Sequence, residues 1–242
     1  MPGDLDLMRL QAATLYLLDE QGRMVALNEA ARPAAPRVFL GRTPEGNVWH
    51  VRRDLPPDLA GQLGDLLAAE PVADDLLAAG SAGRPAEPRC LPALWAALAP
   101  AAPVEREWRG PAYLIPPGAA APAALPLLEL AEGDRGLLAP PFEWLAAELA
   151  ERAPCLAAVE GGRAVAVCFC SRRGDGAAEA GVETAPEQRG RGLASAAAAA
   201  WAAAVRGRGL LPLYSTGWDN LASRGVARRL GARLYGEDLS LT

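Results

Sequence analysis

The stretch that most constrains this chain covers residues 182–195 and reads VETAPEQRGRGLAS. It predicts a strand that stops before Pro186, which has no N–H for a sheet ladder, then a turn and a long alanine-rich helix. Gly190 and Gly192 flank Arg191 at the helix entrance, where glycine lets the backbone approach a ligand closely. The unpaired N–H groups of a first helical turn, together with the helix dipole, attract anions and phosphate above all. The stretch therefore predicts a phosphate-binding turn, with an ordinary exposed loop as the alternative.

The turn matches neither of the two common phosphate motifs. The chain contains no GxxxxGK[ST], and no GxGxxG follows the strand. Arg189 and Arg191 still add forked donors, which suit phosphate oxygens.

Bulk composition narrows the class of protein. With 242 residues, the chain is long enough for one large domain or two small ones. The net charge of −5 argues against general nucleic-acid binding. Charges interrupt every long apolar segment, and the N-terminus lacks the layout of a secretory signal, so we expect a cytoplasmic protein that does not bind membranes.

The cysteines and the histidine exclude several chemistries. Cys168 and Cys170 sit two apart in an expected strand, face the same side and are poor disulfide partners. No CxxC or Cys/His cluster indicates zinc, so we expect no metal. His50 is the only histidine, and it lies far from any nucleophile-elbow pattern, which argues against a serine–histidine triad.

Periodicity and turn signals give the order of elements. In the first part we expect four short strands at 15–18, 24–27, 37–40 and 48–51, with a turn at Gly46 and Asn47, and helices at 58–69, 74–79 and 91–99. The segment 119–126 is small and punctuated by proline, so it predicts a linker between an N-terminal α+β domain (1–118) and a second domain (127–242). In that second domain we expect a helix at 141–152, a hairpin of 155–160 and 163–170, a strand at 177–184, a helix at 194–206, a strand at 211–215, a helix at 220–230 and a strand at 234–241. The crossover helix makes the strands at 177–184 and 211–215 parallel neighbours.

This order resembles the GNAT superfamily of N-acetyltransferases, whose phosphate signature is Arg/Gln-x-x-Gly-x-Gly/Ala. The RGRGLA of residues 189–194 fits it. A second block, Asn220, Ser223, Val226–Ala227, Leu230 and Gly231, resembles the family's Asn-x-x-Ser-x-x-Val-Ala-x-x-Leu-Gly segment. The resemblance covers roughly half the chain, from about residue 127. It implies a mixed α+β sheet of GNAT type there, and the N-terminal part is expected to be a smaller α+β domain, with a degenerate GNAT-like repeat as one reading.

The resemblance implies that acetyl-CoA is the co-substrate. The turn would hold the pyrophosphate through its N–H groups, the strand before it would splay from its parallel neighbour and pair with the pantetheine arm, and Asn220 and Ser223 would lie near the far end of that arm. The implied cofactor-binding residues are Val182, Glu183, Thr184, Arg189, Gly190, Arg191, Gly192, Leu193, Ala194, Ser195, Asn220 and Ser223.

Attack of an amine on a thioester needs a base for the ammonium, a proton for the thiolate and an N–H for the oxyanion. Glu179 or Glu183 is the candidate base, since both lie on one face of a regular strand and Glu179 resembles the family's glutamate position; solvated strand charges are the alternative. Many family members carry the acid as a tyrosine where this chain has Ala227. Tyr214 and Tyr235 are substitutes outside the pattern, and Ser215, at a strand end near the expected thiol, is the third catalytic candidate.

The leading function is an acetyl-CoA-dependent N-acetyltransferase acting on a small-molecule or protein amine by direct attack. Two alternatives stay open: a coenzyme A-binding regulatory module with weak or lost catalysis, and an N-acyltransferase that uses a longer acyl-CoA. The N-terminal domain either covers the acceptor side or serves as a structural extension or homodimer interface. The acceptor itself is left open, because variable loops form its pocket.

Overall fold

The computed structural model describes residues 2–76 and 84–242. Contacts divide the chain into two compact units. Unit 1 contains residues 1–112, 215–220 and 234–242, and unit 2 contains residues 113–214 and 221–233. The domain limits at 118 and 127 stay predictions; the contacts show that unit 1 also takes two segments from the C-terminal part of the chain.

Unit 1 combines helices with a mixed set of strands. Within it, β4, β3, β11 and β5 follow one another in the sheet, while β1 and β2 form a separate antiparallel pair. The predicted strands of this region are confirmed with small shifts at their ends. Its elements are α1 (Asp4–Leu15), β1 (Tyr16–Leu18), β2 (Met24–Leu27), β3 (Val38–Thr43), β4 (Gly46–Val51), α2 (Pro57–Ala68), α3 (Leu91–Leu98), most of β5 (Glu107–Leu114) and most of β11 (Arg233–Leu241).

The β3–β4 turn does not lie where the sequence predicted it. Gly46 and Asn47 belong to β4, and the hairpin closes at the pair Thr43–Gly46. The Thr43 hydroxyl accepts hydrogen bonds from the N–H groups of Glu45 and Gly46, at 3.2 and 3.1 Å, and donates one to the Gly46 carbonyl at 2.7 Å. A threonine side chain therefore builds this turn, and the Gly-Asn signal marks only the start of the strand.

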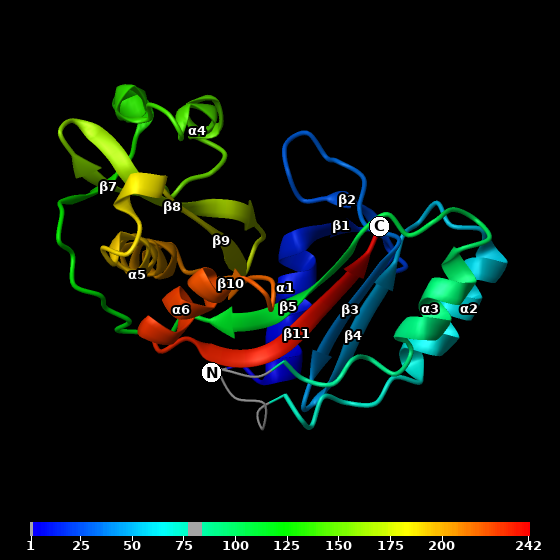
Figure 1. The fold of residues 1–242 in the computed structure, drawn as a ribbon. Coiled ribbons are helices and arrows are strands. Elements are labelled where there is room, and N and C mark those ends of the chain that lie inside the picture. Colours follow the sequence, from blue (N-terminus) through cyan, green and yellow to red (C-terminus); the bar gives the residue numbers. More distant parts are fainter. Residues whose placement is uncertain (1, 77–83) are drawn as a thin grey trace. The chain divides into compact units, whose positions relative to one another are not determined.

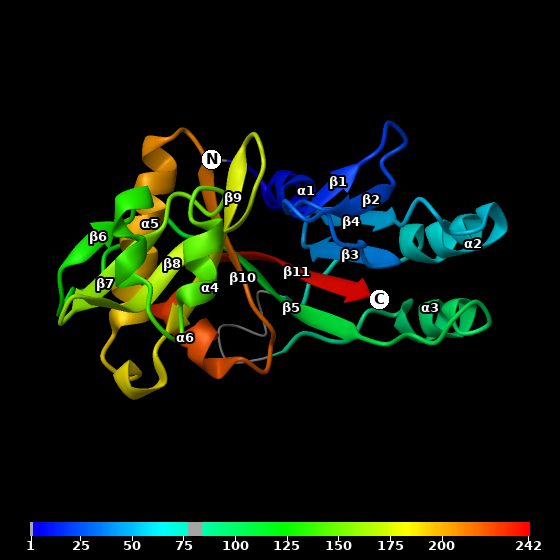
Figure 2. The ribbon, with the colours of Figure 1, turned by 90° about the horizontal axis from the view of Figure 1, so that it is seen from above.

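One face of the unit 1 sheet packs on α2 and α3, which lie side by side (Figure 2). Both helices are as predicted within a residue or two, and their leucines meet alternate strand residues. The expected helix at 74–79 falls partly on residues 77–83, outside the described residues, and residues 74–76 form a turn. The core between helices and sheet includes Val38, Leu40, Leu63, Leu67, Leu94, Leu98, Leu239 and Leu241.

Helix α1, which the sequence interpretation missed, buries Met8 against the sheet. A Cβ at Gly41 or Gly236 would lie 2.3 Å from Met8 atoms, so these two strand positions have to be glycine to admit the side chain. Two polar residues of α1, Gln11 and Thr14, are also buried, which hides the helical pattern in the sequence.

Unit 2 is a five-strand arrangement in the order β10–β9–β8–β7–β6. Figure 1 shows α4 on one side of β7, β8 and β9 and α5 on the other. The predicted hairpin, crossover helix and strands are confirmed, whereas β6 was not expected and α4 is shorter than predicted. The elements are β6 (Leu127–Glu129), η1 (Glu132–Leu137), α4 (Glu143–Glu148), β7 (Leu156–Glu160), β8 (Arg163–Arg173), β9 (Ala177–Thr184), η2 (Pro186–Gln188), α5 (Leu193–Gly207), β10 (Leu211–Ser215) and α6 (Leu221–Arg229).

Each face of the unit 2 sheet has its own core. On the α4 side, Phe142 and Leu145 pack with Val167 and Phe169, and the Trp144 and Phe169 rings meet edge to face, 5.3 Å between centroids. On the other side α5 contributes a nearly continuous alanine face and the fully buried Trp201. Small alanine side chains let α5 lie close to the strands, which fixes the position of its first turn.

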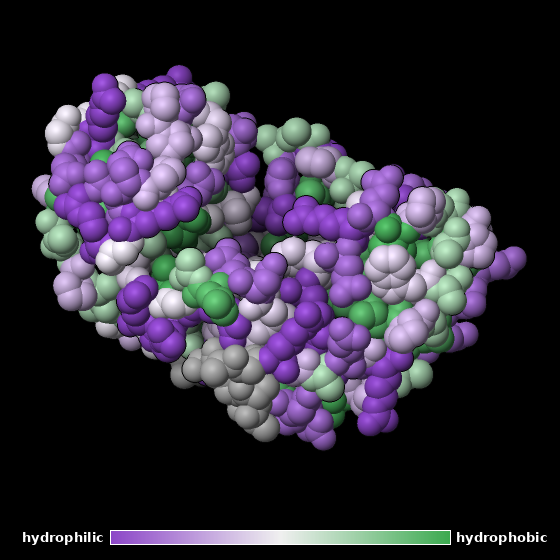
Figure 3. Space-filling model, viewed as in Figure 1, coloured by the Kyte–Doolittle hydropathy of each residue, from purple (hydrophilic) through white to green (hydrophobic). Residues whose placement is uncertain are grey.

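The surfaces of the units differ in character. In the view of Figure 3, the part of unit 2 that carries α4 and β7 is mainly hydrophilic. In unit 1, apolar groups come to the surface near α2 and α3 in the same view. The half-exposed tryptophans of unit 1, Trp49 on β4 and Trp95 on α3, add to its apolar surface.

Candidate functional site

The turn between β9 and α5 has the backbone that an anion site needs. Gly190 and Gly192 have φ of +80° and +78°, a left-handed conformation that glycine adopts without strain. Gly192 is the N-cap of α5, and no side chain caps the helix. The first intrahelical bond of this end runs from the Ala196 N–H to the Gly192 carbonyl, 3.1 Å. The N–H groups at 193–195 therefore point out of the helix end, where an anion can accept them.

A cavity of 430 Å³ opens at this turn. Ser195 lines it and is 1% exposed, and its buried hydroxyl has no hydrogen-bond partner in the described part of the chain. A buried hydroxyl without a partner costs free energy unless a ligand or water satisfies it. The residues present therefore fit a phosphate group. The cavity is lined by Ala120, Ala121, Pro122, Gly190, Arg191, Gly192, Ser195 and Arg229.

Arg191 forms an ion pair with the β7–β8 hairpin. Its guanidinium donates to both carboxylate oxygens of Glu160, at 3.0 and 2.9 Å, and also to the Gln188 side chain. The Arg191 hydrogen bond lowers the pKa of Glu160, and the same bond raises the pKa of Arg191. This ion pair holds the β9–α5 turn against the end of the β7–β8 hairpin.

The two parallel strands separate before the turn. β10 pairs with β9 from Leu211–Ala177 to Leu213–Glu179, and the pairing ends there. On its other edge β9 stays paired with β8 as far as Thr184. The edge of residues 182–184 that faces away from β8 is therefore not paired with β10, which is the splay that the resemblance implied.

Glu179 and Glu183 share a face of β9 but differ in environment. Glu179 is 3% exposed and stands at the last residue that pairs with β10, whereas Glu183 is exposed. They are four positions apart along the strand, which is about 13 Å at about 3.3 Å per residue. A single proton-transfer site can therefore use only one of them directly.

The candidates for the acid lie in different surroundings. The Tyr214 hydroxyl is buried and hydrogen-bonds the Ser223 hydroxyl at 2.5 Å, and burial raises the pKa of Tyr214 well above its usual value. Tyr235 is fully buried in unit 1, where its hydroxyl donates to the Gln11 side chain at 2.7 Å, so it belongs to the core. Ala227 is buried in α6, and Ser215 is the last residue of β10.

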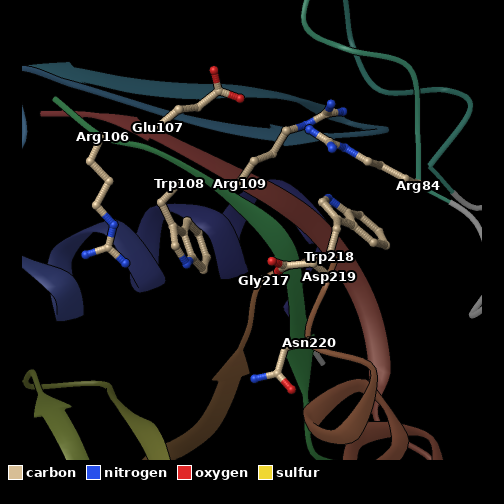
Figure 4. A pocket seen from close by; sticks show the side chains of 9 residues that line it. All are labelled: Arg84, Arg106, Glu107, Trp108, Arg109, Gly217, Trp218, Asp219 and Asn220. Carbon is tan, nitrogen blue, oxygen red and sulfur yellow. The ribbon is translucent and has the colours of Figure 1, made fainter. Parts of the chain in front are cut away.

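Unit 1 holds a separate cavity of 590 Å³ that sequence reasoning did not predict (Figure 4). Asn220 lines it, as do Trp108 and Trp218, and both sides of β5 contribute, with Arg106 and Trp108 pointing one way and Glu107 and Arg109 the other. The Trp218 indole N–H donates to the buried Glu237 carboxylate at 2.7 Å. The cavity is lined by Arg84, Arg106, Glu107, Trp108, Arg109, Gly217, Trp218, Asp219 and Asn220.

Glu237 is the centre of a buried charge network in unit 1. It pairs with Arg42 at 3.1 Å and with Arg109, and Arg42 in turn lies 3.3 Å from Glu70. The side chains of all four are at most 4% exposed. The network fixes Trp218, so it holds one wall of the cavity in unit 1.

Residues 148–237 match the family model described as GNAT acetyltransferase. This match falls on the strands, turn and helices described above. The GNAT match covers these residues, which make up less than half of the chain. The predicted fold class, a mixed α+β sheet of GNAT type in the C-terminal half and a smaller α+β part before it, is confirmed. The match supports an acyl-CoA-dependent acetyltransferase at the level of the family.

Solved structures of GNAT proteins are similar to this chain. One from Novosphingobium aromaticivorans is 23% identical, with 57% of this chain and 65% of that chain covered and a TM-score of 0.43. An acetyltransferase from Colwellia psychrerythraea is 13% identical over 100% of this chain and 97% of that one, at a TM-score of 0.49. A tandem GNAT protein from the clavulanic acid biosynthesis pathway is 17% identical, with 72% and 61% covered and a TM-score of 0.40. The chain thus spans less than two thirds of the first and third of these. A search of curated proteins finds no match.

Across residues 2–76 and 84–242, no helix combines the length and the apolar character needed to cross a bilayer. Over the same residues, no group of three or more His, Cys, Asp and Glu side chains is arranged to hold a metal ion.

Proposed function

We propose that this protein is an N-acetyltransferase that moves an acetyl group from acetyl-CoA to an amine by direct attack. The observation that carries the proposal is the turn itself: two left-handed glycines, an uncapped helix N-terminus and the buried, unpartnered Ser195 hydroxyl around one cavity. Acetyl-CoA supplies the activated thioester. The proposed binding residues are Val182, Glu183 and Thr184 through their main chain, Arg189, Gly190, Arg191, Gly192, Leu193, Ala194 and Ser195 at the turn, and Asn220 and Ser223 at the far end of the arm.

Glu179 is the proposed base. A lysine-like amine has a pKa of about 10.4, so at pH 7 fewer than about one molecule in 10³ is neutral and nucleophilic. A carboxylate that takes up the ammonium proton, directly or through water, removes most of that penalty. Burial at the point where β9 and β10 separate favours Glu179 over the exposed Glu183.

Protonation of the leaving group contributes less to this reaction than deprotonation of the amine. A thiol has a pKa of about 8.5, so a thiolate leaves without full protonation at neutral or slightly basic pH. Tyr214 stays protonated because burial raises its pKa, which suits a hydrogen-bond donor better than a proton donor. We propose Ser215 as a donor to the departing sulfur, with transfer depending mainly on the position of the amine.

The residue at position 227 favours a second candidate function. Its alanine side chain cannot donate a proton, and a coenzyme A-binding regulatory module would need no donor there. The two functions share the phosphate-binding turn and differ in turnover.

A thiol-release assay with a panel of amines separates these functions. We expect acetyl-CoA to bind and at least one amine to release free thiol; binding without thiol release from any amine would leave only the regulatory module. Longer acyl-CoA donors in the same assay test whether acetyl is the preferred group.

Two matched variants test the base. Glu179→Gln should lower the rate and remove the acidic limb of the pH–rate profile, which arises when that carboxylate is protonated. Glu183→Gln, an exposed change on the same strand face, should have little effect. If both variants keep the wild-type rate and pH dependence, the assignment of the base is wrong.

A further inference from the structure

A second arginine, Arg229, faces the cavity at the turn from another element. It is the final residue of α6, is exposed, and lines the same cavity as Gly190, Gly192 and Ser195. Its guanidinium lies along its own helix, 3.7 Å from where a Cβ on Gly225 would stand. In the part of the chain that the structure describes, Arg229 makes no ion pair or hydrogen bond.

Unlike that of Arg229, the guanidinium of Arg191, which lies in the glycine turn, already has partners. Glu160 occupies its guanidinium with two hydrogen bonds, and Gln188 takes a third. The charge of Arg191 is neutralised by the Glu160 carboxylate, and its donors are already used. An incoming phosphate would have to break a bidentate pair to reach it.

We propose that Arg229 is the cation that binds a phosphoryl group of the donor nucleotide at the turn, and that Arg191 is a positioning residue that holds the turn against Glu160. The proposal rests on the proposed function, because the phosphoryl group is that of coenzyme A. The site then combines the N–H groups at 193–195, the Ser195 hydroxyl and a free guanidinium, which are the donors that phosphate oxygens accept.

Part of the segment 119–126, which the sequence predicted as a linker, lies at this cavity. Ala120, Ala121 and Pro122 line the cavity with Arg229, so the segment predicted as a simple connection provides a wall. These three residues carry no charge, so the cations among the lining residues are Arg191 and Arg229. Arg191 is already paired with Glu160, which leaves Arg229 as the unpaired cation of the described lining.

The test is calorimetric titration of the full chain with coenzyme A, using Arg229→Gln and the matched control Arg228→Gln. Arg228 is the preceding residue on α6, is also exposed, and does not line the cavity. We expect Arg229→Gln to raise Kd roughly ten- to hundredfold, as expected for loss of a charge-assisted hydrogen bond, and Arg228→Gln to stay within about twofold of wild type. We also expect the salt dependence of log Kd to become shallower only in Arg229→Gln.

The same titration with 3′-dephospho-coenzyme A identifies the phosphoryl group. If the loss in Arg229→Gln persists with this ligand, Arg229 binds the diphosphate; if the loss disappears, it binds the 3′-phosphate. Both results support the proposal. Equal effects of Arg229→Gln and Arg228→Gln would overturn it.

Arg191→Gln and Glu160→Gln test the positioning role. If Arg191 acts only through its pair, the two variants should weaken binding by a similar factor and leave the salt dependence of log Kd unchanged. A shallower salt dependence in Arg191→Gln, with unchanged or tighter binding in Glu160→Gln, would transfer the phosphate role to Arg191 and overturn the proposal. Failure of the wild-type chain to bind coenzyme A would instead refute the proposed function.

Discussion

Gly192 offers the sharpest perturbation of the turn. Its φ is +78°, and a Cβ built there has no heavy atom within 4 Å. Gly192→Ala therefore introduces no clash, and its cost is conformational, about 1–2 kcal/mol for an L-residue held in the left-handed region. Without ligand, the turn of the variant can leave the left-handed conformation and so relieve this strain. Ligand binding then has to restore that conformation, and its cost lowers the affinity. The affinity for acetyl-CoA should fall about five- to thirtyfold, since about 1.4 kcal/mol is tenfold.

Gly209 provides the matched control for this substitution. It follows the other end of α5, its φ is +77°, and a Cβ there also has no heavy atom within 4 Å. Gly209→Ala introduces the same conformational strain in the same unit, away from the turn. Its Kd for acetyl-CoA should remain within about twofold of wild type, while its melting temperature falls by several degrees.

Calorimetric titration of both variants with acetyl-CoA measures the two Kd values and tests whether strain at Gly192 itself weakens binding. A Gly192→Asn variant should bind better than Gly192→Ala, because asparagine adopts the left-handed region more readily. Wild-type affinity of Gly192→Ala for acetyl-CoA, or an equal loss of affinity in Gly209→Ala, would show that the conformation of Gly192 does not control binding.

Three further predictions concern stability and reactivity. Burial lowers the pKa of His50, whose Nδ1–H donates to the Gly22 carbonyl at 2.6 Å. The unfolded state therefore binds more protons between the folded-state pKa and about 6.5, so the free energy of unfolding should rise with pH across that window. The single imidazole signal in an NMR titration gives the pKa, and a value at or above about 6.5 contradicts this prediction. Burial raises the pKa of Cys90 and Cys155 to about 12, so a thiol reagent at pH 7.5 should label neither until the chain is unfolded, and rapid labelling of the native protein would show the burial to be wrong. Glu237→Gln should lower the free energy of unfolding by about 3–5 kcal/mol, because it leaves the buried Arg42 guanidinium without this carboxylate partner. If denaturant unfolding shows a loss below about 1 kcal/mol, the buried ion pairs of Glu237 do not stabilise the protein as we expect.

Most of unit 2 could be predicted from the sequence because its signals are local. Gly161 and Gly162 form the hairpin turn, with φ of +58° and +75°, and Gly190 and Gly192 form the turn at the helix entrance. Such positions need glycine for backbone reasons alone, so the residue type reveals the conformation. The long α5 helix and the strands around it followed from these fixed points.

Strand β5 could not be predicted in this way. Gly110 and Pro111 stand in its middle, and such a pair normally argues against a strand. In the structure a Cβ on Gly110 would lie 1.8 Å from the Thr216 carbonyl oxygen, and the Pro111 carbonyl accepts the Thr216 N–H at 3.4 Å. The glycine is required by a chain segment more than a hundred residues away, and no local pattern reports such a contact.

In the candidate site, too, some features have a local sequence signal and others depend on contacts between distant segments. The glycines of the turn and the Asn220 to Gly231 block were visible as motifs. The pairing of Arg191 with Glu160, the cavity residue Arg229 and the burial of Glu179 depend on which elements meet. From the sequence, both Arg189 and Arg191 were predicted to donate to the phosphate, and Arg229 was not considered. An arginine in a helix, three residues after a buried valine, has no sequence pattern that indicates a binding role.

The most direct test of the account is an amide NMR titration of the ¹⁵N-labelled chain with acetyl-CoA. We predict that the largest shifts occur at residues 190–195, with further shifts at 182–184, because these main-chain N–H groups would contact the donor. Saturable binding with no shift at 190–195, or no binding at all, would contradict the claim that this turn holds coenzyme A.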